Sequence, residues 1–233
     1  MIPGNSGGYA HQPQRNQREG WKQGQGKDEE SWLIAHTTCL GSPADMPTWD
    51  ELTAFRTAGF KRADGTVLHP IATAIDSGGH FTDQVYRYCA AFEKQHVFAI
   101  KGRHDGAIIG RFSRNNRYKC RLAIVGTHAA KLTLLSRLRI NKPAPGYIHL
   151  PDWLDEEHIA QLTSEKLVRR WKKNQGSVQE WVKTRARNEL WDLFVYNLAA
   201  LHSRGVSWVQ KTLGSRKLVG TKANPPPPPP ATA

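Results

Sequence analysis

The stretch HPIATAIDSGGHFTDQVYRYC, residues 69–89, contains the pattern that sets the fold class. Its apolar run 71–75 is typical of a buried strand, and the pair of glycines that follows suits a tight turn. The next residues, 81–94, place apolar side chains on one stripe and predict a helix. Asp76 therefore lies at the carboxyl end of a strand, which is the edge where open α/β sheets hold their binding crevices.

Strands and helices alternate on both sides of this stretch. Further helices are predicted at 48–58, 129–140 and 187–202, and further strands at 31–39, 96–102, 118–128 and 146–151. In the helix 129–140, Leu132, Leu135 and Leu138 are expected to face inward. Strands that alternate with helices predict an α/β domain built on a central sheet.

The two ends of the chain differ in composition from this body. Residues 1–30 are rich in Gly, Gln and Asn and nearly devoid of apolar side chains, so we expect a disordered polar segment without a strand. The last twelve residues, KANPPPPPPATA, predict an extended polyproline tail. We therefore divide the chain into a disordered segment 1–30, a folded domain 31–203 and a basic, Pro-rich tail 204–233.

The chain carries a formal net charge of +13, and its cations are concentrated in two blocks. Residues 101–140 and residues 161–222 each carry a formal charge of +9. Such runs are often only a solvated surface, but two basic blocks around an acidic strand end favour a groove for a phosphate backbone. We expect double-stranded DNA to bind there in a salt-sensitive and sequence-tolerant way. The expected contacts are Lys101, Arg103, Lys131, Arg137 and the basic residues of 166–187.

The cysteines and the lengths of the apolar runs indicate the cellular compartment of the protein. Three cysteines without a CxxC pair predict reduced thiols rather than a zinc site or disulfides. Met1 is followed by no apolar run of signal-peptide length, and no stretch reaches the roughly 18 apolar residues of a membrane span. We therefore expect a soluble protein of the cytoplasm without a membrane partner.

Two acids are candidates for catalysis. Asp76 ends a strand, and Asp192 lies among apolar residues near the start of the helix 187–202. A carboxylate among apolar neighbours is costly to bury unless a cation compensates it. The two acids together suit an oxygen-ligand site for Mg²⁺ or Mn²⁺, which polarises a phosphate and activates water. Alternatively, Asp76 forms the turn or caps the next helix, and Asp192 pairs with Arg187.

Two further residues are weaker candidates. Glu189 lies one helical turn before Asp192, although a surface or salt-bridging role suits it better. His128 follows a glycine turn, and no partner ligands for a metal are evident beside it. We therefore interpret His128 as a structural residue rather than a ligand.

Seven blocks of sequence lie in order along about residues 30–203. They read ESWLI, AIDSGGHFTDQVYRYC, VFAIKG, VGTHAAKLTLLSRL, PGYIHLP, QLTSEKLVRRW and RNELWDLFVYNLAAL. In type and order these blocks resemble the nuclease portion of phage terminase large subunits of the lambda A-protein type, the motors that package and cut viral DNA. The resemblance implies an RNase H-like mixed sheet flanked by helices, with acids from two strands and one helix holding two divalent metals.

The resemblance also implies roles for particular residues and partners. Asp76 matches the second acid of the family, and Asp192 matches its helix acid. The implied activity is that of a metal-dependent endodeoxyribonuclease that cuts concatemeric viral DNA in the host cytoplasm. Its implied cofactor is Mg²⁺ or Mn²⁺, and its implied partners are double-stranded DNA, a small terminase subunit and a portal.

Three departures from the family pattern affect these expectations. The region before residue 31 shows neither a strand pattern nor an apolar-apolar-Asp motif for the leading acid of the family. GQGKDEES does not satisfy a P-loop, so no ATPase half is expected. His128 and Leu132 stand where the family usually has Asp.

We therefore expect a truncated nuclease domain, lacking its first acid-bearing strand, with an incomplete two-metal site. Such a chain is expected to show little or no cleavage in Mg²⁺ and at most a trace in Mn²⁺. Two alternatives remain. One is a catalytically dead DNA-binding prophage remnant, and the other is a structural protein that binds partners through the Pro-rich tail.

Overall fold

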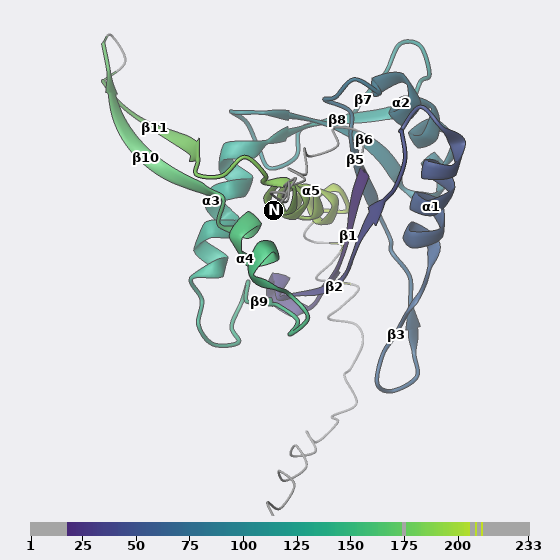
Figure 1. Cartoon of the computed structure of the whole chain (residues 1–233), viewed down its shortest axis with the longest axis horizontal. Coiled ribbons are helices and arrows are strands. Elements are labelled where there is room, and N and C mark those ends of the chain that lie inside the picture. The colour runs from purple at the N-terminus through teal and green to yellow at the C-terminus, as the bar shows by residue number, and fades with distance from the viewer. Residues whose placement is uncertain (1–17, 174–175, 206–207, 209–210, 212–233) are drawn as a thin grey trace, which may run out of the picture.

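The computed structural model describes residues 18–173, 176–205, 208 and 211, which form mixed sheets flanked by helices (Figure 1). The predicted α/β class is therefore confirmed, and the arrangement is consistent with the RNase H-like architecture that the resemblance implies. Residues 1–17 and most of 204–233, for which the sequence predicted disorder, lie outside the described residues. Among the described helices, none has the length and apolar character needed to cross a bilayer.

The stretch that decides the fold class enters a four-stranded sheet with the order β5-β6-β8-β7. Its strands are β5 (Thr73–Asp76), β6 (Val97–Arg103), β8 (Arg121–Gly126) and β7 (Ser113–Arg114). The first three run parallel, and the short β7 is antiparallel to β8. β6 is buried from Val97 to Ile100, as expected for an inner strand of a parallel sheet. Parallel pairing brings the ends of β5 and β6 to one edge, where Asp76 lies opposite Ile100.

A second sheet, with the order β1-β2-β9, corrects the prediction that residues 1–30 contain no strand. β1 (Arg18–Gln25) pairs antiparallel with β2 (Ser31–Cys39), and β9 (Ile148–His149) pairs parallel with β2. A short 3-10 helix (Lys27–Glu29) occupies the turn between β1 and β2.

The sequence concealed β1 because Trp21 is its one large apolar residue. Neighbouring elements supply the apolar cover instead. Gly20 lets helix α1 (Met46–Thr57) approach closely, since a Cβ at this position would meet the Phe55 ring at 3.1 Å. A strand covered in this way needs few apolar residues of its own, so its period-2 pattern is weak.

Helix α5 (Glu189–Ser203) lies at the centre of the molecule and packs against both β1 and β5 (Figure 1). It also contacts α3 (Thr127–Leu138) and α4 (Glu156–Leu162). Phe194, Val195 and Ala199 of α5 are fully buried, and Trp21 of β1 meets Phe194 edge to face with ring centroids 5.1 Å apart. This packing fixes the first turn of α5 relative to both sheets.

A second apolar cluster lies beneath α1 and α2 (Thr82–Ala91), which is followed by a short 3-10 helix (Glu93–Gln95). It includes all three cysteines of the chain: Cys39, Cys89 and Cys120. Each is at most 1 % exposed, and none forms a disulfide. The prediction of reduced thiols is therefore confirmed.

The inward face of α3 agrees with the prediction only in part: Leu138 packs against the core, as expected. Leu132 is exposed, and the buried residues are Ala130, Lys131 and Leu134. Residues 130 and 134 are one helical turn apart and form the stripe that packs inward, whereas position 132 is turned away from it. A lysine therefore enters the interior where the pattern of leucines suggested none.

Two hairpins were not predicted from the sequence. β3 (Phe60–Lys61) and β4 (Val67–Leu68) form a small one. β10 (Glu165–Lys172) and β11 (Gly176–Lys183) form a long two-stranded ribbon that extends away from the body beyond α3 (Figure 1). Its many cations interrupt the apolar alternation by which a strand is recognised.

Candidate functional site

Asp76 is held at the carboxyl edge of the four-stranded sheet by the turn that follows it. Its Oδ1 accepts a hydrogen bond from the Gly78 N–H at 3.0 Å, and a Cβ at Gly78 would crowd this oxygen at 3.3 Å. Ser77 is buried, and its N–H and its hydroxyl both donate to the Ile100 carbonyl, at 2.9 and 2.8 Å. The turn-forming alternative for Asp76 is therefore realised, and the turn also fixes the carboxylate beside β6.

Asp192 belongs to a polar network at the first turn of α5. Asn188, which is buried, donates from Nδ2 to Asp192 at 3.1 Å and to Glu165 at 3.0 Å, and its Oδ1 accepts from Lys183 at 2.7 Å. The ammonium of Lys131 lies 2.7 Å from Glu165 and 3.8 Å from Asp192. The network thus joins α3, the base of the β10–β11 ribbon and α5 around one carboxylate.

The Asp192 carboxyl group has a strongly raised pKa. Burial is the largest cause and raises the pKa to about 6, and the nearby carboxylates of Glu165 and Glu189 also raise it. Lys131 and Lys183 act in the opposite direction without cancelling the effect. A carboxylate in this condition is stabilised by any further positive charge that reaches it.

Glu189 and Tyr196 connect Asp192 to Asp76. Burial raises the pKa of Glu189, and the carboxylates of Glu19 and Asp76 raise it further. Tyr196 lies one helical turn after Asp192, and its hydroxyl is hydrogen-bonded to Asp76. Burial raises the Tyr196 pKa, as do the charges of Asp76, Asp192 and Glu189. The charges of Asp76, Asp192 and Glu189 therefore act on the same residues of α5.

Glu19 of β1 is an acid of this region that the sequence reading missed. Its side chain is 8 % exposed and pairs with Arg187, and its Oε2 lies 3.3 Å from the Nε2 of His36. Burial would raise the pKa of Glu19, but hydrogen bonds from His36 and Arg187 outweigh burial and lower it. Arg187 thus pairs with Glu19 rather than with Asp192. The sequence signal was absent because Glu19 is placed only by the pairing of β1 with β2.

Among the described residues, these acids have the donor atoms that a divalent cation requires. Their carboxylate oxygens are the donors that Mg²⁺ and Mn²⁺ prefer. Burial and the neighbouring carboxylates raise the pKa values of Asp192 and Glu189, and a bound cation would favour their charged forms. However, within the described part of the chain no group of three or more His, Cys, Asp or Glu side chains lies close enough together to hold an ion. The donor chemistry fits a cation, and the carboxylates would have to move together to bind it.

The four predicted DNA contacts fall into two groups. Lys101 and Arg103 lie at the carboxyl end of β6, the strand beside Asp76. Lys131 is buried in the Asp192 network, and Arg137 pairs with Glu29, whose Oε2 also lies 3.8 Å from His202. His202 is ten residues after Asp192, about 15 Å farther along the axis of α5, so Arg137 lies toward the other end of this helix. Lys131 thus contacts Glu165 and Asp192 directly, whereas Arg137 is paired elsewhere, with Glu29.

His128 has protein partners in the structure. The indole Nε1 of Trp181 donates to its Nδ1 at 3.1 Å, and the His104 ring stacks on it with centroids 5.0 Å apart. Its backbone N–H donates to the His104 carbonyl at 3.1 Å. These contacts tie the start of α3 to the ribbon and to the loop after β6.

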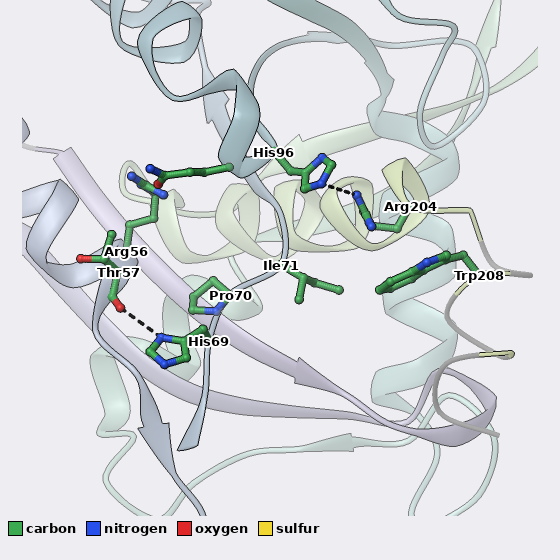
Figure 2. A pocket seen from close by; sticks show the side chains of 9 residues that line it. Arg56, Thr57, His69, Pro70, Ile71, His96, Arg204 and Trp208 are labelled. Atoms are coloured by element: carbon green, nitrogen blue, oxygen red, sulfur yellow. Dashed lines mark hydrogen bonds between the residues drawn. The ribbon is translucent and has the colours of Figure 1, made fainter. Parts of the chain in front are cut away.

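A hollow at the opposite end of β5 contains no acid (Figure 2). Arg204 donates to His96 at 2.9 Å, and its guanidinium lies over the Trp208 ring at 4.4 Å. Ile71, two residues before β5, and His96, just before β6, place this hollow at the amino-terminal edge of the sheet. Figure 2 shows these side chains with His69, whose ring nitrogen lies 3.3 Å from the Thr57 carbonyl. The acids and this hollow therefore occupy opposite edges.

Fold and site together define an α/β domain in which Asp76 ends a parallel strand and the first turn of α5 places Asp192 beside Lys131. The family model described as the endonuclease domain of the terminase large subunit gpA matches residues 14–212. The chain therefore belongs to this family, and the resemblance read from the seven sequence blocks is confirmed.

Two curated relatives agree with this assignment. The chain is 28 % identical over 194 residues to the terminase large subunit of Escherichia phage lambda, covering 79 % of this chain and 30 % of that protein. It is 27 % identical over 205 residues to the terminase large subunit of Enterobacteria phage P21, covering 84 % of this chain and 32 % of that protein. The chain thus spans about a third of the length of these relatives. No solved structure matches it significantly.

Proposed function

We propose that this chain is a metal-dependent endonuclease domain that hydrolyses phosphodiester bonds of double-stranded DNA. The observation that carries the proposal is the placement of the acids around α5: Tyr196, one turn after Asp192, is hydrogen-bonded to Asp76 of β5, and the carboxylates of Asp76 and of Glu19 in β1 act on Glu189. The family to which the chain belongs is named for its endonuclease domain. In this proposal the chain acts in the host cytoplasm beside a small terminase subunit and a portal.

The proposed cofactor is Mg²⁺ or Mn²⁺, bound by Asp76, Asp192 and Glu189. When bound, such an ion would polarise the scissile phosphate and lower the pKa of its water. The residues of the chain prepare the site. Lys131 and Lys183 offset part of the negative charge of the cluster, and Tyr196 orients Asp76 through its hydrogen bond.

Glu19 changes one expectation from the sequence. Little cleavage was expected because no strand was predicted for the leading acid of the family. A strand with an acid is present in β1, and the charge of Glu19 acts on Glu189. We propose that Glu19 takes part in this site and supports cleavage by this chain.

The test is nicking of supercoiled plasmid by the purified chain at low salt, in separate arms with Mg²⁺ and Mn²⁺. We expect nicking by the wild-type chain and a loss of at least about 100-fold in Asp76→Asn and in Asp192→Asn, because each substitution removes an anionic oxygen ligand. Asp50→Asn, at an exposed position of α1, is the matched control and should nick as the wild type does.

Two further arms decide between the enzyme and the remnant. Glu19→Gln should lose about 10-fold if Glu19 supports the site indirectly through the field at Glu189. A chain that binds duplex DNA without nicking it in either metal would establish the alternative, a catalytically dead DNA-binding remnant. Nicking that survives both Asp76→Asn and Asp192→Asn would refute the site.

A further inference from the structure

The β10–β11 ribbon is paired along its whole length and has two chemically different faces. Glu165 pairs with Lys183 at its base, and Lys172 pairs with Gly176 at its far end. Successive residues of a strand point to opposite faces. One face therefore carries Arg169 and Trp171 of β10 with Gln179 and Trp181 of β11. We call these four residues the inner face.

The inner face is turned toward the body of the domain. Trp181 donates its indole N–H to His128 at the start of α3. Farther out, Arg169 and Gln179 line one side of a hollow whose other side is formed by His104, Asp105 and His128. Asp105 lies 2.8 Å from the Nδ1 of His104, so this acid is already paired. The hollow thus lies between the ribbon and the loop that follows β6.

The charges of the ribbon are arranged differently on its two faces. On the outer face, Arg170 and Lys172 both pair with Glu180. On the inner face, Arg169 is exposed and makes no ion pair with any described residue. Trp171, two residues farther along the same face, is 81 % exposed. An unpaired guanidinium beside an exposed indole suits a ligand that offers anionic groups and flat apolar edges.

The base of the inner face is joined to the proposed catalytic acids. Glu165 is bonded to Lys131 and Asn188, and both of these contact Asp192. Trp171 is six residues from Glu165, a distance of about 20 Å along a strand. Twenty ångströms corresponds to about six base pairs of duplex DNA. A duplex that reaches the acids can therefore also lie along the ribbon.

We propose that the inner face is a docking surface for duplex DNA, in which Arg169 binds a backbone phosphate and Trp171 packs against sugars and base edges about six base pairs from the acids. The proposal rests on the proposed function, because it extends the same DNA path outward from the acid cluster. Charge complementarity and continuity with the acids select DNA as the occupant, and a two-stranded ribbon has a size that a DNA groove admits.

The first test compares two adjacent arginines on opposite faces. Binding of a fluorescent 24-base-pair duplex is measured by anisotropy without divalent metal, over a series of salt concentrations. We expect Arg169→Gln to weaken binding about 5- to 10-fold and to reduce the log–log salt slope by about one, since one phosphate contact is lost. Arg170→Gln, whose arginine is already paired with Glu180, should change binding less than twofold.

The second test concerns the exposed tryptophan. Trp171→Ala should weaken binding at least about fivefold, because the apolar contact of the indole with sugars and base edges is lost. Trp171→Phe should retain most of the affinity. Trp153→Ala, at another exposed indole that is 44 % accessible, is the matched control and should bind as the wild type does. Both ribbon positions are exposed, so melting temperatures should not change.

The outcomes separate this inference from the function on which it rests. Wild-type nicking and binding, with Arg169→Gln and Arg170→Gln equally mild, would overturn the inner face and leave the nuclease proposal intact. Equal losses in both arginine variants would also overturn it, because the effect would then reflect net charge alone. Absence of both binding and nicking in the wild type would overturn the proposed function itself.

Discussion

At the residue scale, Asp192 is placed at a cost to stability. It lies in the first turn of α5, where the helix dipole favours a negative charge. The effect of burial is larger than that of the dipole, and the pKa of this carboxyl group is raised from 3.8 to about 6. At neutral pH the folded chain therefore holds an ionised carboxylate that its surroundings partly disfavour. Functional groups are often kept in place at such a cost.

The first residue-scale prediction is that Asp192→Asn stabilises the fold at neutral pH. Because the folded pKa lies above the unfolded one, the stability that this carboxyl group contributes in the wild type is fully present below pH 4 and is lost as pH rises through 6. The variant should therefore gain about 1 kcal/mol relative to the wild type above pH 7 and nothing near pH 4. The gain is modest because the side chain is one-third exposed and screened by water.

Urea denaturation at both pH values measures this difference. Asp50→Asn provides the control, since an exposed aspartate should give the same small change at both pH values. A variant that is less stable than the wild type at pH 7 would show that the contacts of Asp192 with Lys131 and Asn188 outweigh the cost of burying it.

At the element scale, the junction of β8 and α3 is closed by Gly126. Its N–H donates to the Ala107 carbonyl at 2.9 Å, and a Cβ at this position would overlap the carbonyl oxygens of Gly106 and Ala107. The obstructing atoms are backbone, so they cannot move aside as a side chain would. The loop that carries His104 and Asp105 is thereby held against the end of the sheet.

We predict that Gly126→Ala destabilises the protein by about 2–3 kcal/mol, the upper range for overpacking. Gly79→Ala is the matched control, because a Cβ at Gly79 would meet no atom within 4 Å. Thermal and urea unfolding of the two variants measure the difference. Equal midpoints for both would show that the loop shifts freely and that the junction is loose.

The elements that could be predicted from sequence are those that bury their own apolar residues. β5, β6, α2 and α5 were found because their apolar runs or stripes match the period of the element. β1 was missed because the residues that pack over it belong largely to α1 and α5. The β10–β11 ribbon was missed because it is largely exposed and cationic. Such strands form because of pairing and packing with other segments of the chain, so the sequence pattern of the strand alone does not reveal them.

The site was predictable to the same extent. The proposed acids Asp76 and Asp192 could be singled out from the sequence because Asp76 ends an apolar strand and Asp192 lies among the apolar residues of a helix. Glu19 and Glu165 were missed because their positions depend on pairings across the fold, of β1 with β2 and of β10 with β11. Lys131 was predicted as a DNA contact, and the structure places its side chain inward, where it meets Glu165.

At the scale of the whole molecule, we expect the net charge of +13 to dominate the proposed association with DNA. We predict that affinity for duplex DNA falls about 100-fold between about 50 and 200 mM salt, as expected if four or so phosphates are contacted and their counterions released. Anisotropy titrations on two unrelated duplex sequences measure the slope and should give equal values. A flat salt dependence would exclude a phosphate-backbone mode of binding.

The burial of all three cysteines has a practical consequence for following this protein in solution. Cys39, Cys89 and Cys120 are at most 1 % exposed, and burial raises the pKa of the Cys120 thiol and so keeps it unreactive. Maleimide reagents should therefore leave the native chain unlabelled. A single cysteine introduced at Lys166, which is exposed on the outer face of the ribbon, would then accept a dye selectively. Energy transfer from that dye to labelled DNA would report how far each end of a bound duplex lies from the ribbon.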